Sequence, residues 1–193
     1  MDWRLYHAIY SLSLHHHWLG TFFSDVEKAS IPVMIAATAA LWLLARPGGD
    51  RKWKLAAASG FVAAALALLG NVVVHTLWDR PRPYETHAIR HPWSGATDAS
   101  FPSDHASASL AIAFAVLAFD LPIGVAFLAV AALIAAGRVF IGAHYPGDIG
   151  ASVVVAGVAA LVVVRYGRSS VRFLVQLVER VTDPLLRPLR RRG

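Results

Sequence analysis

Long apolar blocks separated by short polar stretches predict helices that cross a membrane. Residues 55–77 contain no formal charge, and residues 121–141 contain a single charged side chain, Arg138. A helix needs about 20 apolar residues to cross the hydrocarbon core of a bilayer. These two blocks meet that length alone, and three shorter ones reach it with Thr, Gly or aromatic flanks, at residues 31–45, 106–119 and 149–164.

Five such blocks leave too little polar sequence to cover them in water. Apolar residues make up 56% of the 193 positions and charged residues 16%, against about 45–50% and about 25% in soluble domains. A buried helix of a soluble protein can look like one of these blocks, but five of them indicate lipid contact. We therefore predict one all-α domain over residues 1–193, a polytopic transmembrane bundle of five to six membrane helices. With no Cys in the chain, a disulfide, a thiolate nucleophile and a Cys-ligated zinc are excluded.

The first part of the chain, about residues 1–23, has a different pattern. Trp3, Tyr6, Ile9 and Tyr10 lie among polar positions. This pattern favours an amphipathic helix that lies at the membrane interface. A poor sixth span is the alternative.

Charge predicts the orientation of the bundle. The tail, about residues 165–193, contains eight Arg and two acidic residues, so it carries the whole formal net charge of +6. The connection between the first two spans adds Arg46, Arg51, Lys52 and Lys54. By the positive-inside rule both are cytoplasmic, and the stretches around 78–104 and His144 face outward. We expect the tail to bind anionic lipid rather than nucleic acid.

The outward-facing stretches contain the polar chemistry. Arg80 and Arg82 follow the second span, and Pro81 and Pro83 alternate with them. The prolines end the helix, and guanidinium groups match the oxygens of phosphate. Contact with lipid headgroups is the alternative interpretation.

The third span opens with the sequence Ser-Phe-Pro-Ser-Asp-His at 100–105. Pro102 and Ser103 suit a helix start, where Ser103 is a cap. Free backbone N–H groups at such a start also attract an anion, and His105 in the first turn can donate or accept a proton there.

The last polar stretch contains Arg138, His144 and Asp148. A charge inside an apolar helix costs about 2.5–3.5 kcal/mol on insertion scales, so Arg138 is expected to face the bundle interior or an ionic partner such as Asp148. Asp148 follows His144 by four residues, so its carboxylate can hold one imidazole nitrogen and leave the other free as a nucleophile.

Together these groups suit attack on a phosphoryl group. Arg side chains stabilise the negative charge, one His attacks phosphorus, and the other His protonates the leaving oxygen. No acidic cluster for Mg²⁺ lies near these residues in the sequence. We therefore expect the positive charge to come from Arg, with no metal and no other cofactor.

The three stretches resemble the motifs of the type 2 phosphatidic acid phosphatase family, which are K-x6-RP, PSGH and SR-x5-H-x3-D. The corresponding segments here are His75-x6-Arg82-Pro83, Pro102-Ser103-Asp104-His105 and Gly137-Arg138-x5-His144-x3-Asp148. The SFPSDH form, the HYP-x-D ending and the small size are most similar to the bacitracin-resistance type of undecaprenyl-diphosphate phosphatase.

The resemblance implies a role for each matched residue. His144 attacks the terminal phosphorus and forms a phosphohistidine, and Asp148 orients it. His105 protonates the departing lipid phosphate and then activates water. Arg82 and Arg138 bind phosphate, Ser103 and nearby backbone amides complete the cradle, and no metal is required.

Three positions depart from the family motifs. His75 stands in place of Lys, so a permanent cation becomes one that titrates near neutral pH. Gly137 replaces Ser and removes a hydroxyl donor, and Asp104 replaces Gly and adds a carboxylate beside the acid. The phosphate-binding set that we predict is Arg82, Arg138, Arg80, Ser103, His75 and Asp104.

The resemblance implies an enzyme that hydrolyses undecaprenyl diphosphate to undecaprenyl phosphate and recycles the carrier lipid of cell-wall synthesis. Its partners are a polyprenyl diphosphate and the bilayer, and no oligomeric state follows from the sequence. The site is expected on the extracytoplasmic side of a bacterial plasma membrane. The alternatives are the same chemistry on phosphatidylglycerophosphate, phosphatidic acid or a lipid A phosphate, and a non-catalytic transporter or scaffold.

Overall fold

Helices form all the regular structure in the part of the chain that the structure describes. The structure is a computed structural model. It describes residues 2–45, 50–89 and 98–190, and the side chains of these residues as far as residue 186. The helices are α1 (Asp2–His15), α2 (His17–Leu44), α3 (Lys52–Leu77), α4 (Pro83–Thr86), α5 (Asp104–Leu117), α6 (Leu121–Phe140), α7 (Pro146–Arg165) and α8 (Arg168–Arg190). The predicted all-α fold class is confirmed.

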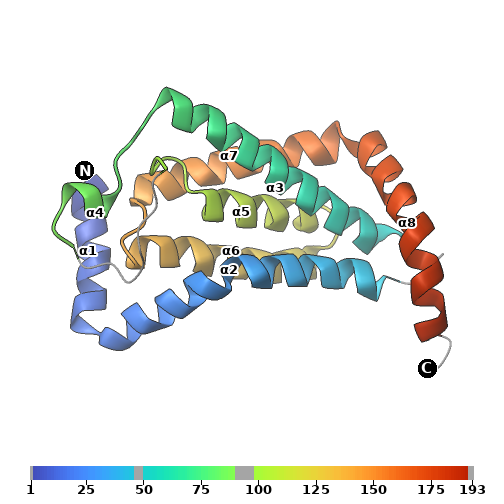
Figure 1. Cartoon of the computed structure of the whole chain (residues 1–193), viewed down its shortest axis with the longest axis horizontal. Helices are drawn as coiled ribbons and strands as arrows, with labels where there is room; N and C mark the ends of the chain where they lie inside the picture. Colours follow the sequence, from blue (N-terminus) through green and yellow to red (C-terminus); the bar gives the residue numbers. More distant parts are fainter. Residues whose placement is uncertain (1, 46–49, 90–97, 191–193) are drawn as a thin grey trace.

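Helix α5 forms the centre of the bundle, with α2, α3, α6 and α7 around it (Figure 1). Ten of its fourteen residues are buried, and most of these are Ala or Ser. Small side chains let neighbouring helix backbones approach closely. Within the described residues α2, α3, α6 and α7 have the length and composition of membrane spans, whereas α5 is shorter. The apolar block at residues 106–119 thus forms a helix enclosed by protein, which need not match the bilayer thickness.

The N-terminal helix lies across one end of the bundle (Figure 1). It ends at His15, and α2 begins at His17, so residues 17–23 belong to the first span rather than to the helix predicted over 1–23. Tyr6 and Tyr10 are buried in a cluster with Val139 and Tyr145. Contact with the ends of α6 and α7 therefore holds α1 in place, and its location at the membrane interface stays a prediction.

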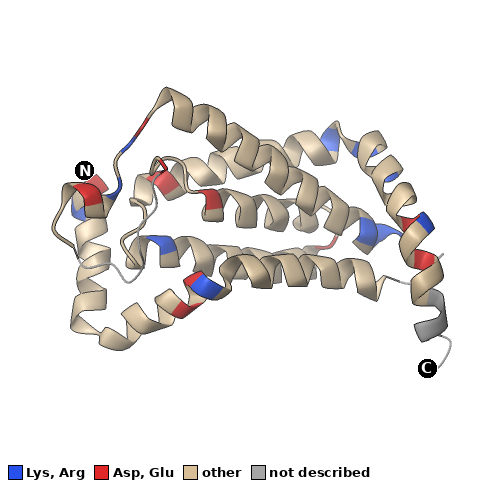
Figure 2. Ribbon diagram, viewed as in Figure 1, with Lys and Arg blue, Asp and Glu red and all other residues tan. Residues whose placement is uncertain are grey.

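Helix α2 is longer than the apolar block that predicted it. The block began at residue 31, whereas the helix runs from residue 17 to residue 44 and contains Pro32. Its first half carries acidic and basic residues (Figure 2), including Glu27. This extension brings Glu27 to the site described below.

At the opposite end of the bundle, α8 lies across the start of α3 (Figure 1). Lys54 is 1% exposed and binds Glu179 and Asp183, with its Nζ 3.0 and 2.6 Å from their oxygens. Removing one partner of such a buried ion pair lowers the free energy of unfolding by about 3–5 kcal/mol. These contacts therefore attach α8 to the bundle. The described basic residues of the tail thus lie at the end far from α1 (Figure 2); Arg46 and residues 191–193 lie outside the described ranges.

Candidate active site

The three polar stretches meet at the end of the bundle that α1 covers. Arg82 lies between α3 and α4, Arg138 in the last turn of α6, and His144 in the turn that leads to α7. All three are buried, with 3%, 4% and 1% of their surface exposed. Residues far apart in the sequence therefore form one enclosed cationic site.

His144 faces both guanidinium groups through one ring nitrogen. Its Nε2 lies 3.1 Å from Nη1 of Arg82 and 3.3 Å from Nη2 of Arg138. Its Nδ1 lies 2.7 Å from the carbonyl oxygen of Ser100. Because a carbonyl only accepts hydrogen bonds, this network assigns the proton to Nδ1 and the lone pair to Nε2.

Burial keeps the His144 ring neutral. Loss of solvent contact, together with the positive charges of Arg138 and Arg82, lowers the pKa of His144 to about 4. A neutral imidazole has a free lone pair, which a nucleophile requires. At neutral pH the ring therefore carries a free lone pair on Nε2.

The turn after α6 connects His144 directly to Arg138. The backbone N–H groups of Ala143 and His144 both donate to the Arg138 carbonyl oxygen. Gly142 has a φ of +80°, and a Cβ there would lie 2.9 Å from Cδ1 of Ile89. A side chain in this left-handed conformation costs about 1–2 kcal/mol, so glycine permits the turn that presents His144.

Asp148 lies at ion-pair distance from His144 and is also connected to it through Ser100. Its Oδ2 lies 3.7 Å from Nδ1 of His144, beyond hydrogen-bond distance. The Ser100 hydroxyl donates to Oδ2 at 2.6 Å, and the backbone N–H of Tyr145 donates at 2.8 Å. The fully buried carboxylate thus holds the residue whose carbonyl orients the imidazole, a role of Ser100 that sequence reasoning missed.

Arg80 lies on the other side of Asp148, away from the expected phosphate site. Its Nη1 donates to Asp148 at 2.6 Å, its Nη2 donates to Asp2 at 2.7 Å, and its guanidinium lies 4.3 Å from the centre of the Tyr145 ring. Both terminal nitrogens of the Arg80 guanidinium, which we expected to bind phosphate, thus donate hydrogen bonds to carboxylates. This geometry favours a role for Arg80 in neutralising Asp148 and attaching α1 to the site.

Asp98 orients the guanidinium of Arg82. Nη2 of Arg82 donates to the Asp98 carboxylate at 2.9 Å, and Nε donates to its backbone carbonyl at 3.1 Å. Burial raises the pKa of Asp98, but the charge and hydrogen bond of Arg82 more than offset this, so the pKa lies below its usual range. The sequence motifs contain no signal for this residue.

Glu27 brings a further carboxylate into the site from α2. It forms an ion pair with Arg138, and its Oε1 lies 3.7 Å from Nε2 of His105. Sequence reasoning missed Glu27 because the predicted span began four residues later. The available signal was an ionisable residue beside a long apolar block, which in membrane helices usually marks a function.

Ser103 supports the start of α5 from within the bundle. Its Oγ accepts from the backbone N–H of Ala106, and its own N–H donates to Oγ of Ser152. Ser103 is completely buried. The capping interpretation of this residue is therefore observed, and direct contact with phosphate remains a prediction.

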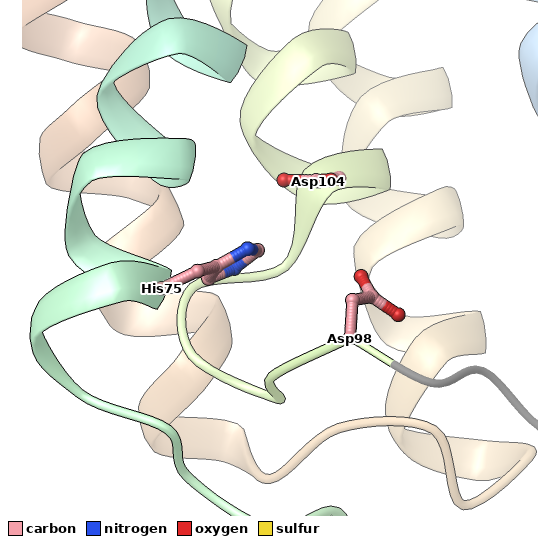
Figure 3. Close-up of side chains that lie close together, drawn as sticks. All are labelled: His75, Asp98 and Asp104. Carbon is pink, nitrogen blue, oxygen red and sulfur yellow. The ribbon is translucent and has the colours of Figure 1, made fainter.

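His75, Asp98 and Asp104 gather beside the site, and their ligand atoms lie within 4.8 Å of one another (Figure 3). The expectation that no acidic cluster lies nearby was wrong, because folding brings together residues separated in sequence. Such a set can ligate a cation, but each member has a protein partner. His75 contacts the Pro102 carbonyl, Asp98 contacts Arg82, and Asp104 accepts from Asn71.

We expect phosphate release by the purified protein to continue at an unchanged rate in excess chelator. The physical reason is that Arg82 and Arg138 already supply positive charge at His144. The measurement is phosphate release in EDTA, with added Mg²⁺ or Ca²⁺ as the comparison. Loss of activity in EDTA that a cation restores would contradict this expectation and direct mutagenesis to His75 and Asp104.

Comparison with known proteins agrees with this arrangement. The model of the PAP2 superfamily matches residues 55–172. The chain is 29% identical to the undecaprenyl-diphosphatase BcrC of Bacillus subtilis over 98% of its length and 95% of that protein. It is 33% identical to the decaprenylphosphoryl-5-phosphoribose phosphatase of Mycobacterium tuberculosis over 65% of its length and 67% of that protein.

Two solved structures share the fold. LpxE of Aquifex aeolicus superposes with a TM-score of 0.70 at 19% identity, covering 84% of this chain and 94% of that one. A transmembrane PAP2-type phosphatidylglycerolphosphate phosphatase of Bacillus subtilis superposes with a TM-score of 0.62 at 17% identity, covering 87% and 85%. With a family match over more than half of its length and three motifs that meet at one end of a helical bundle, this chain belongs to the PAP2 superfamily of membrane phosphatases.

Proposed function

We propose that the protein hydrolyses undecaprenyl diphosphate to undecaprenyl phosphate and inorganic phosphate through a phosphohistidine at His144. The observation that carries this proposal is the position of Nε2, a neutral nucleophile that faces two buried guanidinium groups. Such donors stabilise the negative charge of a phosphoryl group during transfer.

In the first step, Nε2 of His144 attacks the terminal phosphorus. The bond from phosphorus to the bridging oxygen breaks, and that oxygen keeps the electron pair. His105 donates a proton to the bridging oxygen, which leaves as undecaprenyl phosphate. Arg82 and Arg138 bind the oxygens of the transferred group, and the Ser100 carbonyl stabilises the positive charge that develops on the ring.

In the second step, water replaces His144 on phosphorus. The unprotonated His105 takes a proton from the attacking water, and the bond between phosphorus and Nε2 breaks. Phosphate leaves, and His105 and His144 return to their starting protonation states. Protons and electron pairs therefore balance over the cycle.

The choice of substrate rests on the similarity to BcrC, which covers 98% of this chain. Charge supports an extracytoplasmic site, because the described basic residues of α8 and the start of α3 lie at the opposite end of the bundle (Figure 2). We infer a multi-pass protein of the bacterial plasma membrane that recycles the cell-wall carrier lipid. The polyprenyl chain of the substrate remains in the bilayer.

A second candidate is the same reaction on another lipid phosphate. The Mycobacterium tuberculosis relative is named for a decaprenyl-linked phosphoribose, so a family member of similar sequence is associated with a different polyprenyl lipid. Both candidates share the site and differ in the group attached to the terminal phosphate.

Phosphate release from a panel of purified lipids tests the proposal. We expect kcat/KM for undecaprenyl diphosphate to exceed that for phosphatidylglycerophosphate, phosphatidic acid and a lipid A phosphate by at least about tenfold, the ratio for about 1.4 kcal/mol of transition-state stabilisation. Preference for one of the other lipids would support the second candidate. No phosphate release from any of them would favour the transporter or scaffold.

A further inference from the structure

Glu27 lies outside every sequence feature that assigns a function to this chain. It is on α2, whereas the family match begins at residue 55, and it belongs to none of the three motifs. Its side chain is 19% exposed and points to the buried end of α6. The mechanism above does not use it.

The two histidines of the site have equivalent carboxylate neighbours. Glu27 Oε1 lies 3.7 Å from Nε2 of His105, and Asp148 Oδ2 lies 3.7 Å from Nδ1 of His144. Asp148 is also connected to the nucleophile through Ser100. Glu27 is in the corresponding position beside the residue that must act as an acid.

The charges around His105 make its protonation depend on Glu27. The groups that face His105 are Glu27 of α2, Arg138 of α6, Arg82 from the segment before α4, and Asp104 of its own helix. Burial and the two guanidinium groups lower the pKa of His105, and the two carboxylates offset part of this shift. Without Glu27, two positive charges would face His105 with one negative charge to balance them.

A general acid must hold its proton until the leaving oxygen takes it. We propose that Glu27 is a positioning residue whose carboxylate favours the protonated form of His105, an inference that rests on the proposed function. The carboxylate also neutralises part of Arg138, so its charge serves both the acid and the phosphate ligand. Glu27 therefore affects the pH at which activity declines on the alkaline side of the profile.

The pH dependence of Glu27→Gln tests this role. An opposite charge within about 4–6 Å shifts the pKa of its partner by about one unit or more. We expect the alkaline limb of kcat/KM to move to lower pH by about one unit, so that activity at pH 8, as a fraction of the maximum of the same profile, falls about tenfold. Glu27→Asp, which keeps the charge, restores the limb at least in part.

Asp25→Asn is the matched control. Asp25 lies on the same helix, two residues away, and its side chain is 67% exposed and paired with Lys28. This variant removes the same charge from α2 without touching His105 or Arg138. We expect its pH profile to coincide with that of the wild type.

A double mutant separates this inference from the proposed function. In a His105→Ala background Glu27→Gln should cause no further change in the shape of the pH profile, because the imidazole on which its charge acts is absent. If His105→Ala is inactive but Glu27→Gln keeps the wild-type pH profile, the role of Glu27 is overturned and the proposed function stands. Equal losses at every pH in Glu27→Gln and Glu27→Asp also overturn it, because they indicate structural support alone. If His105→Ala keeps wild-type turnover, the acid assignment in the proposed function fails.

Discussion

Replacement of His144 by alanine is expected to abolish phosphate release, with a loss of at least about 10⁴-fold, as when the nucleophile of a covalent mechanism is removed. The variant retains Arg82 and Arg138 but has no lone pair at the position of Nε2. Phosphate release from the lipid diphosphate measures the loss. Insertion into the membrane should be unchanged, because the imidazole contacts the site rather than the lipid-facing surface of a span.

Trapping the intermediate identifies the nucleophile independently of the rate. Rapid denaturation of the wild type during turnover, followed by peptide mass spectrometry, should place a phosphoryl group on His144. His15→Ala is the control, because His15 is exposed on α1. Near wild-type turnover in His144→Ala, or a phosphoryl group on another residue, would refute the proposed covalent step.

Replacement of His105 by alanine is expected to lower kcat by about 10²–10⁴-fold, the usual contribution of a general acid or base. His105 lies in the first turn of α5, with Glu27, Arg138 and Arg82 around it. In the proposed cycle it transfers a proton in both steps, so its loss slows both formation and hydrolysis of the phosphohistidine. Single-turnover measurements resolve the two steps, because the lipid product is released in the first step and inorganic phosphate in the second.

The leaving group provides a sharper test of the acid role. An aryl phosphate has a weakly basic leaving oxygen that departs with little help from a proton, whereas an alkyl phosphate requires one. His105→Ala should therefore lose much less activity on the aryl ester than on a lipid monophosphate in the first step. Equal losses on both substrates would show that His105 does not protonate the leaving oxygen.

Local patterns in the sequence were sufficient for the fold class and for the motif residues. The apolar blocks predicted α3, α6 and α7 closely, because a helix that crosses lipid must be continuously apolar. They underestimated α2, since its first half carries the charged residues Asp25, Glu27 and Lys28, of which Glu27 reaches the site. Proline after α3 and before α7 correctly marked the ends of helices, because a proline residue lacks the N–H that a helix interior requires.

These local patterns did not predict which side chains of the different motifs contact one another. Asp148 was predicted to hold His144 directly, and Arg80 was predicted to bind phosphate. In the fold Ser100 contacts both Asp148 and His144. Arg80 donates hydrogen bonds to Asp148 and Asp2. A spacing of four residues brings two side chains near one another, but it does not determine which of several nearby acceptors lies closest.

The sequence by itself determined that this chain is helical, that its helices have the composition of membrane spans, and that it carries the histidines and arginines of three motifs, since each of these depends on residue type and short spacing. Only the tertiary structure decided that Glu27 faces His105, that Asp98 orients Arg82, and that His75 and Asp104 lie together. These contacts join separate helices and loops. Their geometry follows from how the helices pack around α5, which no local pattern encodes.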